Sequence, residues 1–127
     1  MSSKMFLVLD LNGTIKFDPQ RIRECLSALD GVHDWSDDTA DALFECQFDF
    51  AGDNTIVLVP KELDSVSVWG MGDASLRVAL EIQRCYDTDI HALNDSFTMD
   101  IVLSEVNSVD EFKQRIEGEW GQSAVSR

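Results

Sequence analysis

Two long stretches of this chain contain no lysine and no arginine. Residues 24–60 hold nine acidic side chains and residues 85–112 hold seven, with no lysine or arginine in either stretch. The rest of the chain is nearly balanced, so these stretches account for the formal net charge of -14 over 127 residues. Such a surface repels nucleic acid and anionic lipid and attracts basic proteins. We therefore expect a basic protein partner, and neither nucleic acid nor a membrane.

Long apolar runs are absent as well. No stretch approaches the roughly 20 apolar residues of a transmembrane helix, and the first apolar run is interrupted at Asp10. We therefore expect neither a membrane span nor a signal peptide. The three cysteines are odd in number, widely spaced and not arranged as C-x-x-C. We expect Cys25, Cys46 and Cys85 to be reduced, buried residues of a cytoplasmic protein.

The composition is that of an ordinary globular domain. Hydrophobic residues make up 44% of the chain, and they include seven Phe and three Trp, which is enough apolar material for a core. A chain of this length fits one domain that folds alone. We expect a single domain over residues 1–120, followed by a flexible tail over residues 121–127 that is small and polar.

The apolar patterns predict both strands and helices. A compact apolar run over residues 4–10 is typical of a central strand, and Asp18-Pro19 then opens a helix that ends at Asp30-Gly31. The acidic segment 32–41 is expected to be a surface loop. Further strands are predicted over residues 42–50, 55–59 and 97–103, with a short or merely extended segment at 65–69. Further helices are predicted from Asp73 to Asp87 and from the capping box at Ser108 onward.

This order of elements predicts an α+β fold. The sequence β-α-β-β-(β)-α-β-α matches the split βαβ, or ferredoxin-like (βαββαβ), arrangement with an additional C-terminal helix. We expect a single mostly antiparallel sheet with helices on one face. The other face is then left for a partner, a lid or the last helix.

One segment resembles a catalytic motif. Residues Val8 to Ile15, VLDLNGTI, resemble the first motif of haloacid dehalogenase-like phosphatases, a hydrophobic strand followed by D-x-D-G-T. Asp10 matches the nucleophile of that family and Thr14 the motif threonine. Asn12 replaces the second Asp, the general acid, and an amide cannot donate and retake a proton as a carboxylic acid does. We interpret the segment as a strand followed by an Asn-Gly turn.

The other signals of chemistry are incomplete. Asp87-Thr88-Asp89 begins like a calcium loop but lacks the later ligands and the turn glycine. His33 and His91 have no metal-ligand spacing around them. The chain contains neither a nucleophile elbow of G-x-S-x-G type nor a phosphate-binding glycine loop. We therefore expect no catalytic residue, no metal site and no cofactor.

The remaining candidate is an acidic segment with an aromatic residue inside it. Carboxylates around Trp35 suit docking to a basic protein, because charge steers the encounter and a buried aromatic residue supplies contact energy. The alternative interpretation is that Trp35 covers the first helix. The predicted partner-binding residues are Asp34, Trp35, Asp37, Asp38, Asp41 and Glu45, extended by the second acidic stretch.

In general character, a small, acidic α+β domain without catalytic motifs is similar to bacterial toxin-immunity proteins. The resemblance is spread over the whole chain. It implies a toxin as partner, often a basic nuclease whose phosphate-binding groove an acidic patch occupies. Two alternatives stay open: a degenerate haloacid dehalogenase-like hydrolase using Asp10, and a ferredoxin-like regulatory module that binds a small ligand or associates with itself. The oligomeric state is left open by the sequence.

Overall fold

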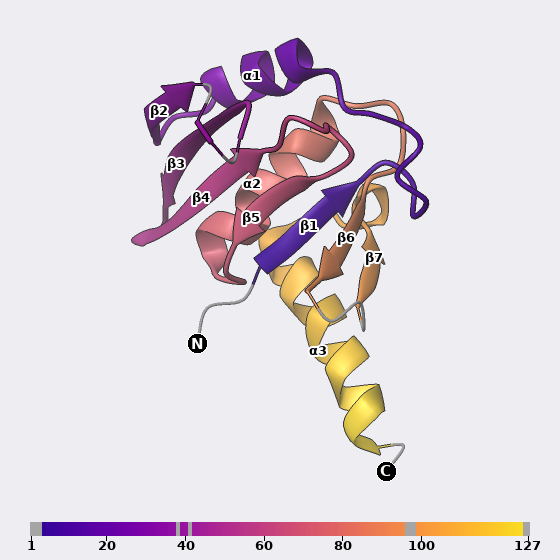
Figure 1. The fold of residues 1–127 in the computed structure, drawn as a ribbon. Coiled ribbons are helices and arrows are strands. Elements are labelled where there is room, and N and C mark those ends of the chain that lie inside the picture. The colour runs from indigo at the N-terminus through magenta and orange to yellow at the C-terminus, as the bar shows by residue number, and fades with distance from the viewer. Residues whose placement is uncertain (1–3, 38, 41, 96–98, 126–127) are drawn as a thin grey trace.

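The computed structural model of the protein describes residues 4–37, 39–40, 42–95 and 99–125, with side chains as far as residue 118. Figure 1 shows one sheet with helices packed beside it. The elements along the chain are β1 (Lys4–Val8), α1 (Pro19–Ser27), β2 (Val32–Asp37), β3 (Phe44–Phe50), β4 (Asp53–Val59), β5 (Val66–Trp69), α2 (Asp73–Arg84), β6 (His91–Asn94), β7 (Asp100–Val102), the short 3-10 helix η1 (Leu103–Glu105) and α3 (Val109–Val125).

In the described residues, seven strands form one open sheet in the order β2-β3-β4-β5-β1-β6-β7, and every neighbouring pair is antiparallel. The longest pairing joins β3 to β4, in register from Phe44↔Val59 to Phe50↔Asp53. β1 lies between β5 and β6, so α2 connects two strands that flank β1. The edges of the sheet are β2 and β7.

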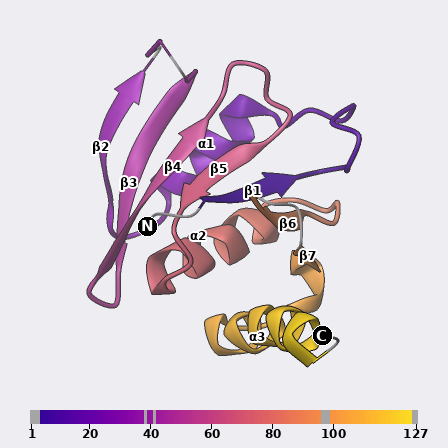
Figure 2. The ribbon, with the colours of Figure 1, turned by 60° about the horizontal axis from the view of Figure 1, so that its bottom comes forward.

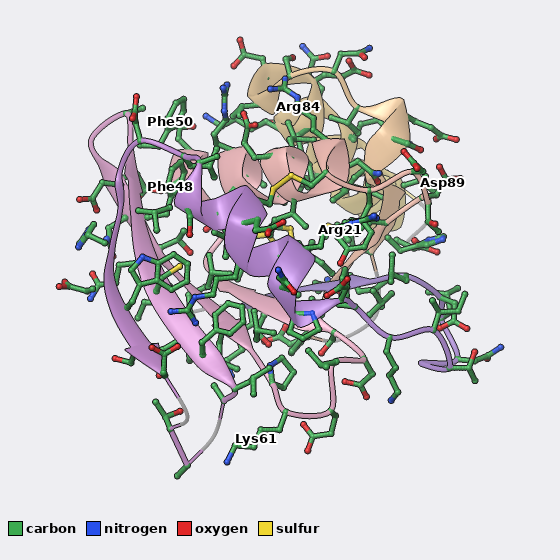
Figure 3. All side chains as sticks on the ribbon, turned by 90° about the horizontal axis from the view of Figure 1, so that it is seen from above. Arg21, Phe48, Phe50, Lys61, Arg84 and Asp89 are labelled. Carbon is green, nitrogen blue, oxygen red and sulfur yellow. A yellow bond between two sulfur atoms is a disulfide. The ribbon has the colours of Figure 1, made fainter. Side chains whose placement is uncertain are left out.

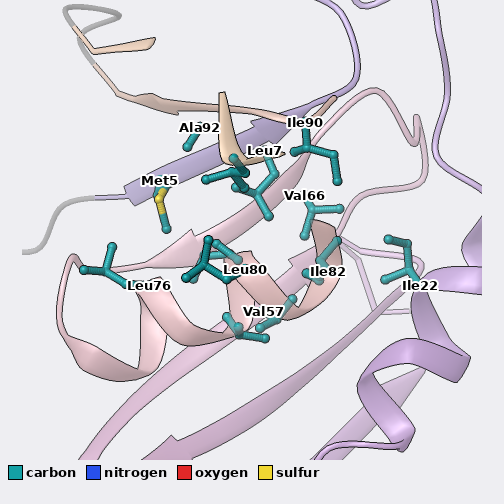
Figure 4. Packing of buried hydrophobic residues seen from close by; sticks show 14 of the residues in the cluster. Met5, Leu7, Ile22, Val57, Val66, Leu76, Leu80, Ile82, Ile90 and Ala92 are labelled. Carbon is teal, nitrogen blue, oxygen red and sulfur yellow. The ribbon is translucent and has the colours of Figure 1, made fainter. Parts of the chain in front are cut away.

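The core lies on one face of the sheet, beneath α1 and α2. Helix α2 contacts β3, β4 and β5 and also packs on α1. Figure 4 shows Met5 and Leu7 of β1 in the same layer as Leu76 and Ile82 of α2, and all four side chains are fully buried. Helix α3 adds a further layer, because it packs on α2, which lies between α3 and the sheet (Figure 2).

The predicted α+β class is confirmed, with one antiparallel sheet and helices against one of its faces. The ferredoxin-like strand order is not confirmed, because the sheet has seven strands and continues beyond β4 into the hairpin of β2 and β3. The last helix packs on α2 rather than on the second face. Within the described residues, that second face carries no helix (Figure 2).

The prediction of a surface loop over residues 32–41 is wrong for its first half. Residues 32–37 form the edge strand β2, which pairs with β3. The register shifts between His33 and Ser36, and Asp34 at this shift has a φ of 56°, which aspartate tolerates better than most residues. Pairing with a neighbouring strand therefore outweighs the low strand propensity of aspartate.

The strand predicted over residues 97–103 is one arm of a hairpin. β7 begins at Asp100, and Leu103 already belongs to η1, while residues 97 and 98 lie outside the described part. β6 is the other arm, and it pairs with both β1 and β7. No strand is predicted over β6 from the sequence, since its four residues are too few to show a clear alternation.

The helix starts follow local sequence signals, with one exception. Asp18 caps α1, because its side chain accepts a hydrogen bond at 3.0 Å from the backbone N–H two residues later. Ser108 caps α3 in the same way, with a bond of 3.1 Å from the backbone N–H three residues later. In α2, Asp73 is the first residue and not the cap, and the side chain of Asp53 on β4 accepts a hydrogen bond from the following backbone N–H at 3.1 Å. α3 continues into the predicted tail, residues 121–127, whose flexibility stays a prediction.

Two of the three cysteines form a disulfide, so the prediction of three reduced cysteines is wrong. Cys25 of α1 is joined to Cys85 at the end of α2, across 60 residues of chain; a bond of this kind is drawn in yellow in Figure 3. The pairing depends on the packing of α1 against α2, which cysteine spacing does not reveal. Cys46 is free and buried. Because disulfides persist mainly outside reducing compartments, the cysteines no longer support a cytoplasmic location.

We expect Gly31→Ala to lower the free energy of unfolding by about 2 kcal/mol or more. Gly31 has a φ of +96°, and an added Cβ would lie 2.4 Å from the backbone oxygen of Asp49. The Gly31 carbonyl also accepts a hydrogen bond from the Asp49 N–H at 3.0 Å, which holds the two backbones together. Gly52→Ala is the matched control, because Gly52 has a φ of +78° but no atom within 4 Å of the added Cβ. Urea unfolding measures the free energy of unfolding of both variants. An equal decrease for Gly31→Ala and Gly52→Ala would contradict the close approach of the two backbones at Gly31.

Candidate functional site

The face of the sheet turned away from the helices is rich in apolar side chains. Neighbouring residues of a strand point to opposite faces, and cross-strand partners share a face. Phe6 of β1 is paired with Ser67 and Leu93, which therefore share its face. We call this helix-free surface the open face. Its apolar residues are Phe6, Val8, Ile56, Leu58, Trp69, Leu93 and Val102. Leu93 is buried by its neighbours, the other six are partly exposed, and none belongs to the helix-side core.

Acidic side chains lie toward both margins of the open face. Glu45 and Asp49 are on β3, next to the edge strand β2, and Asp100 is on β7 at the opposite edge. Among the described strand residues of this face, the one Lys or Arg is Lys4, whose Nζ lies 4.3 Å from the centre of the Trp69 ring. The open face therefore has an apolar centre and negatively charged sides.

The carboxylate of Asp49 is held in place on this margin. The Asn54 side chain donates a hydrogen bond to it at 2.6 Å, which lowers the pKa of Asp49 below its usual value. The imidazole of His33 lies beside it, with Nε2 2.9 Å from Oδ2, and contributes further to the lowered pKa. Asp49 is therefore negatively charged at neutral pH.

A hollow of about 300 Å³ opens on the open face where β1 ends. Its apolar floor is formed by Phe6, Val8 and Leu93. We call it the Asp10 hollow, and its rim is formed by Asp10, Leu11, Asn12, Gly13, Asp64 and Ser65. Two carboxylates therefore lie at the edge of an apolar depression.

The Asp10 carboxylate builds the loop that forms this rim. Its Oδ1 accepts hydrogen bonds from the backbone N–H groups of Thr14 at 3.0 Å and Ile15 at 3.3 Å, and its Oδ2 accepts one from the Thr14 hydroxyl at 2.5 Å. The bond from the hydroxyl, aided by those from the backbone, lowers the pKa of Asp10. Asp10, which matches a phosphatase nucleophile, therefore has both carboxylate oxygens hydrogen-bonded to its own loop. Asn12 on the rim is an amide and cannot act as the general acid.

Two of the six predicted partner-binding residues lie on or beside the open face. Glu45 is the cross-strand partner of Ser36 on the edge strand. Asp34 is exposed at the register shift, with its carboxylate 3.1 Å from Nδ1 of His33. Both carboxylates are accessible to a protein that approaches the β2 edge.

Trp35 and Asp37 lie on the helix side instead. The Trp35 ring is 5.9 Å from that of Phe44, and the guanidinium of Arg23 on α1 lies 4.7 Å from its centre. Asp37 is hydrogen-bonded and ion-paired with Arg23, which lowers the pKa of Asp37 and raises that of Arg23. Trp35 therefore covers the first helix, as the alternative interpretation had it, and Arg23 offsets the charge of Asp37.

The remaining two predicted residues, Asp38 and Asp41, lie outside the described residues. The two acidic stretches do not form one surface through the sheet. Residues 24–60 supply β2, β3 and β4, residues 85–112 supply β6 and β7, and β5 and β1 lie between them. The second stretch therefore borders the other margin of the open face rather than extending the β2 edge.

The other groups considered for chemistry or membrane insertion are a buried thiol, the acidic and histidine side chains, and the helices. Burial raises the pKa of the Cys46 thiol to about 11, so the thiol is protonated at neutral pH. In the part of the chain that the structure describes, no group of three or more His, Cys, Asp or Glu side chains is arranged to hold a metal ion. None of the helices described there is both long and apolar enough to cross a bilayer.

The apolar residues of the open face were not predicted as functional, although the sequence carries a signal for them. In the run Met5-Phe6-Leu7-Val8 both alternating sets of side chains are apolar. A strand with one solvated face alternates between apolar and polar residues. An unbroken apolar run in an antiparallel sheet therefore indicates that both faces are covered, either within the chain or by a partner.

Comparison of the chain with protein-family models, with curated proteins and with solved structures gave no match.

Proposed function

We propose that this chain is a non-catalytic protein-binding domain that uses its open face to bind a basic protein, in the manner of an immunity protein that neutralises a toxin. One observation carries the proposal: a sheet face without a helix holds a patch of apolar side chains. An antiparallel sheet with a solvated face usually presents polar residues there. Apolar patches rimmed by polar residues are typical of interaction sites.

The distribution of charge supports a basic partner. Protein interfaces have an apolar centre and a polar rim, and the open face has Phe6, Leu58 and Trp69 toward its centre with Glu45 and Asp100 toward its sides. A net charge of -14 adds a long-range attraction for cationic proteins. Such steering raises association rates by about ten- to a thousandfold at low salt.

We also infer a ferredoxin-like core beneath this surface. β5, α2 and β6 form a unit whose two strands flank β1, and β4 lies on the other side of β5. In the split βαβ arrangement another strand likewise lies between the strands of the unit. The hairpin of β2 and β3 is then an extension of this core, and it supplies the acidic edge that carries Asp34 and Glu45.

The proposal is tested by capturing proteins from a lysate of the source cells on three tagged forms of the chain. The face variant combines Asp34→Asn with Glu45→Lys, since neither residue pairs with Lys or Arg among the described residues. The control variant combines Asp87→Asn with Glu117→Lys, the same change in net charge at exposed positions on the α2–β6 loop and on α3. We expect basic proteins on wild type and control, and an affinity at least about tenfold lower for the face variant.

Two outcomes would count against this proposal. Equal retention of a basic protein by the face variant would show that the interface is elsewhere, and absence of any basic protein from the wild type would contradict the binding role. The toxin role has its own readout: the captured protein should degrade nucleic acid or arrest growth, and one equivalent of this chain should abolish that activity. A basic partner without toxic activity would contradict the immunity role.

A further inference from the structure

We infer that the Asp10 hollow is the anchor site for one cationic side chain of the basic partner, an ammonium or guanidinium group on an alkyl stem. This inference rests on the proposed function and specifies a contact for it. The hollow opens on the open face, because its floor residues Phe6, Val8 and Leu93 are members of that face. A partner seated on the open face therefore reaches it.

The floor suits the stem of such a side chain. Phe6 and Leu93 are cross-strand partners on β1 and β6, and Val8 lies two residues further along β1. Together they present apolar surface at the bottom of a hollow of about 300 Å³, a volume at the lower end of the range of ligand pockets. Lysine and arginine place their methylene groups along apolar surface and keep the charged group at a polar rim.

The rim suits the charged group. Asp10 is fixed by three hydrogen bonds from its own loop, and its lowered pKa keeps it ionised at neutral pH. Asp64 is half-buried, and among the described residues its carboxylate has no hydrogen-bond or ion-pair partner. Among the described residues, no lysine or arginine lines the hollow. The Asp64 carboxylate is thus available to a cation supplied from outside, and the Asp10 carboxylate adds a second negative charge beside it.

Other occupants fit less well. An anion would be repelled by Asp10 and Asp64, and the described residues offer no third acidic or histidine side chain for a metal ion. A purely apolar group would desolvate the two carboxylates without pairing them, which is unfavourable. A cation on an apolar stem matches both the floor and the rim.

A second feature of the same loop indicates that a protein covers it. Leu11 is 61% exposed and Ile15 is 48% exposed, and they are the only large apolar side chains in the described part of the chain that are this accessible. Leu11 is on the rim of the hollow, and Ile15 is in the loop held by Asp10. When the partner places its cationic side chain in the hollow, apolar surface next to that side chain on the partner would cover Leu11.

The test uses N-acetyl-L-arginine amide as the probe, titrated into the full ¹⁵N-labelled chain and followed by NMR. We expect saturable shifts of the amides of Asn12, Gly13 and Ser65, with a dissociation constant in the millimolar range. The uncharged isostere N-acetyl-citrulline amide should give no saturable shifts. Asp64→Asn should weaken binding of the arginine probe about tenfold, because one charge-assisted hydrogen bond is lost.

Glu117→Gln is the matched control, since Glu117 is exposed on α3, which packs on α2 and not on the open face, and this variant should bind the probe as wild type does. Unchanged binding by Asp64→Asn, equal shifts with citrulline, or shifts only at other residues would overturn the inference. Probe binding at the hollow together with no captured basic protein would contradict the proposed function alone. If wild type captures a basic partner that the face variant does not retain, but the hollow does not bind the probe, the result would contradict the anchor site and leave the proposed function intact.

Discussion

Loss of the Cys25–Cys85 disulfide is expected to lower the free energy of unfolding by about 4 kcal/mol. The bond joins residues 60 positions apart, so cutting it releases a long loop and increases the conformational entropy of the unfolded chain. It also connects α1 to the end of α2, the helix on which α1 packs. For a domain of this size the midpoint of thermal unfolding should fall by about 10 °C or more.

Urea unfolding with and without dithiothreitol measures this effect. The double variant Cys25→Ser with Cys85→Ser should have the reduced stability and should not respond to the reductant. A thiol titration of the denatured, unreduced protein should find one thiol, that of Cys46. Three titratable thiols, or a urea midpoint that dithiothreitol leaves unchanged, would contradict the pairing of Cys25 with Cys85.

Phe112→Ala is expected to cost about 3–5 kcal/mol of stability, as truncation of a fully buried aromatic residue does. Phe112 lies in the first turns of α3 and is completely buried, whereas Lys113 and Gln114 beside it are exposed. α3 packs mainly against α2, so the cavity weakens the contact that holds this helix on the domain. Hydrogen exchange of the α3 amides should accelerate more than exchange in the sheet.

Gln114→Ala provides the matched control for this prediction. It changes an exposed side chain of the same helix and should alter stability by no more than about 0.5 kcal/mol. Urea unfolding of both variants gives the comparison. Similar stabilities for Phe112→Ala and Gln114→Ala would mean that α3 does not depend on its packing against α2.

Local signals predicted those parts of the fold that depend on a few neighbouring residues. Asp18 and Ser108 cap their helices because a cap needs only a side-chain oxygen and the next backbone N–H groups. Strand β3 was predicted from alternation, which the face buried against α2 imposes directly on the sequence. These features do not require knowledge of distant contacts.

Features that depend on distant contacts were not predictable in the same way. Strand β2 exists because β3 offers it a partner, and the disulfide forms because α1 packs against α2. The side of the sheet on which Trp35 lies follows from its contacts with Phe44 and Arg23. The candidate site was therefore only partly predicted: Glu45 is on the open face, whereas the apolar residues at its centre were assigned to strands but not to a function.

Site-specific photo-crosslinking tests most directly whether the open face is a binding surface. The photoreactive residue p-benzoylphenylalanine is placed at position 56, in place of Ile56 on the open face, or at position 114, in place of Gln114 on α3. In a lysate of the source cells, we predict that position 56 crosslinks to a basic protein and that position 114 does not. Crosslinks to a basic protein from position 114 alone, or equally from both positions, would contradict a binding role for the open face.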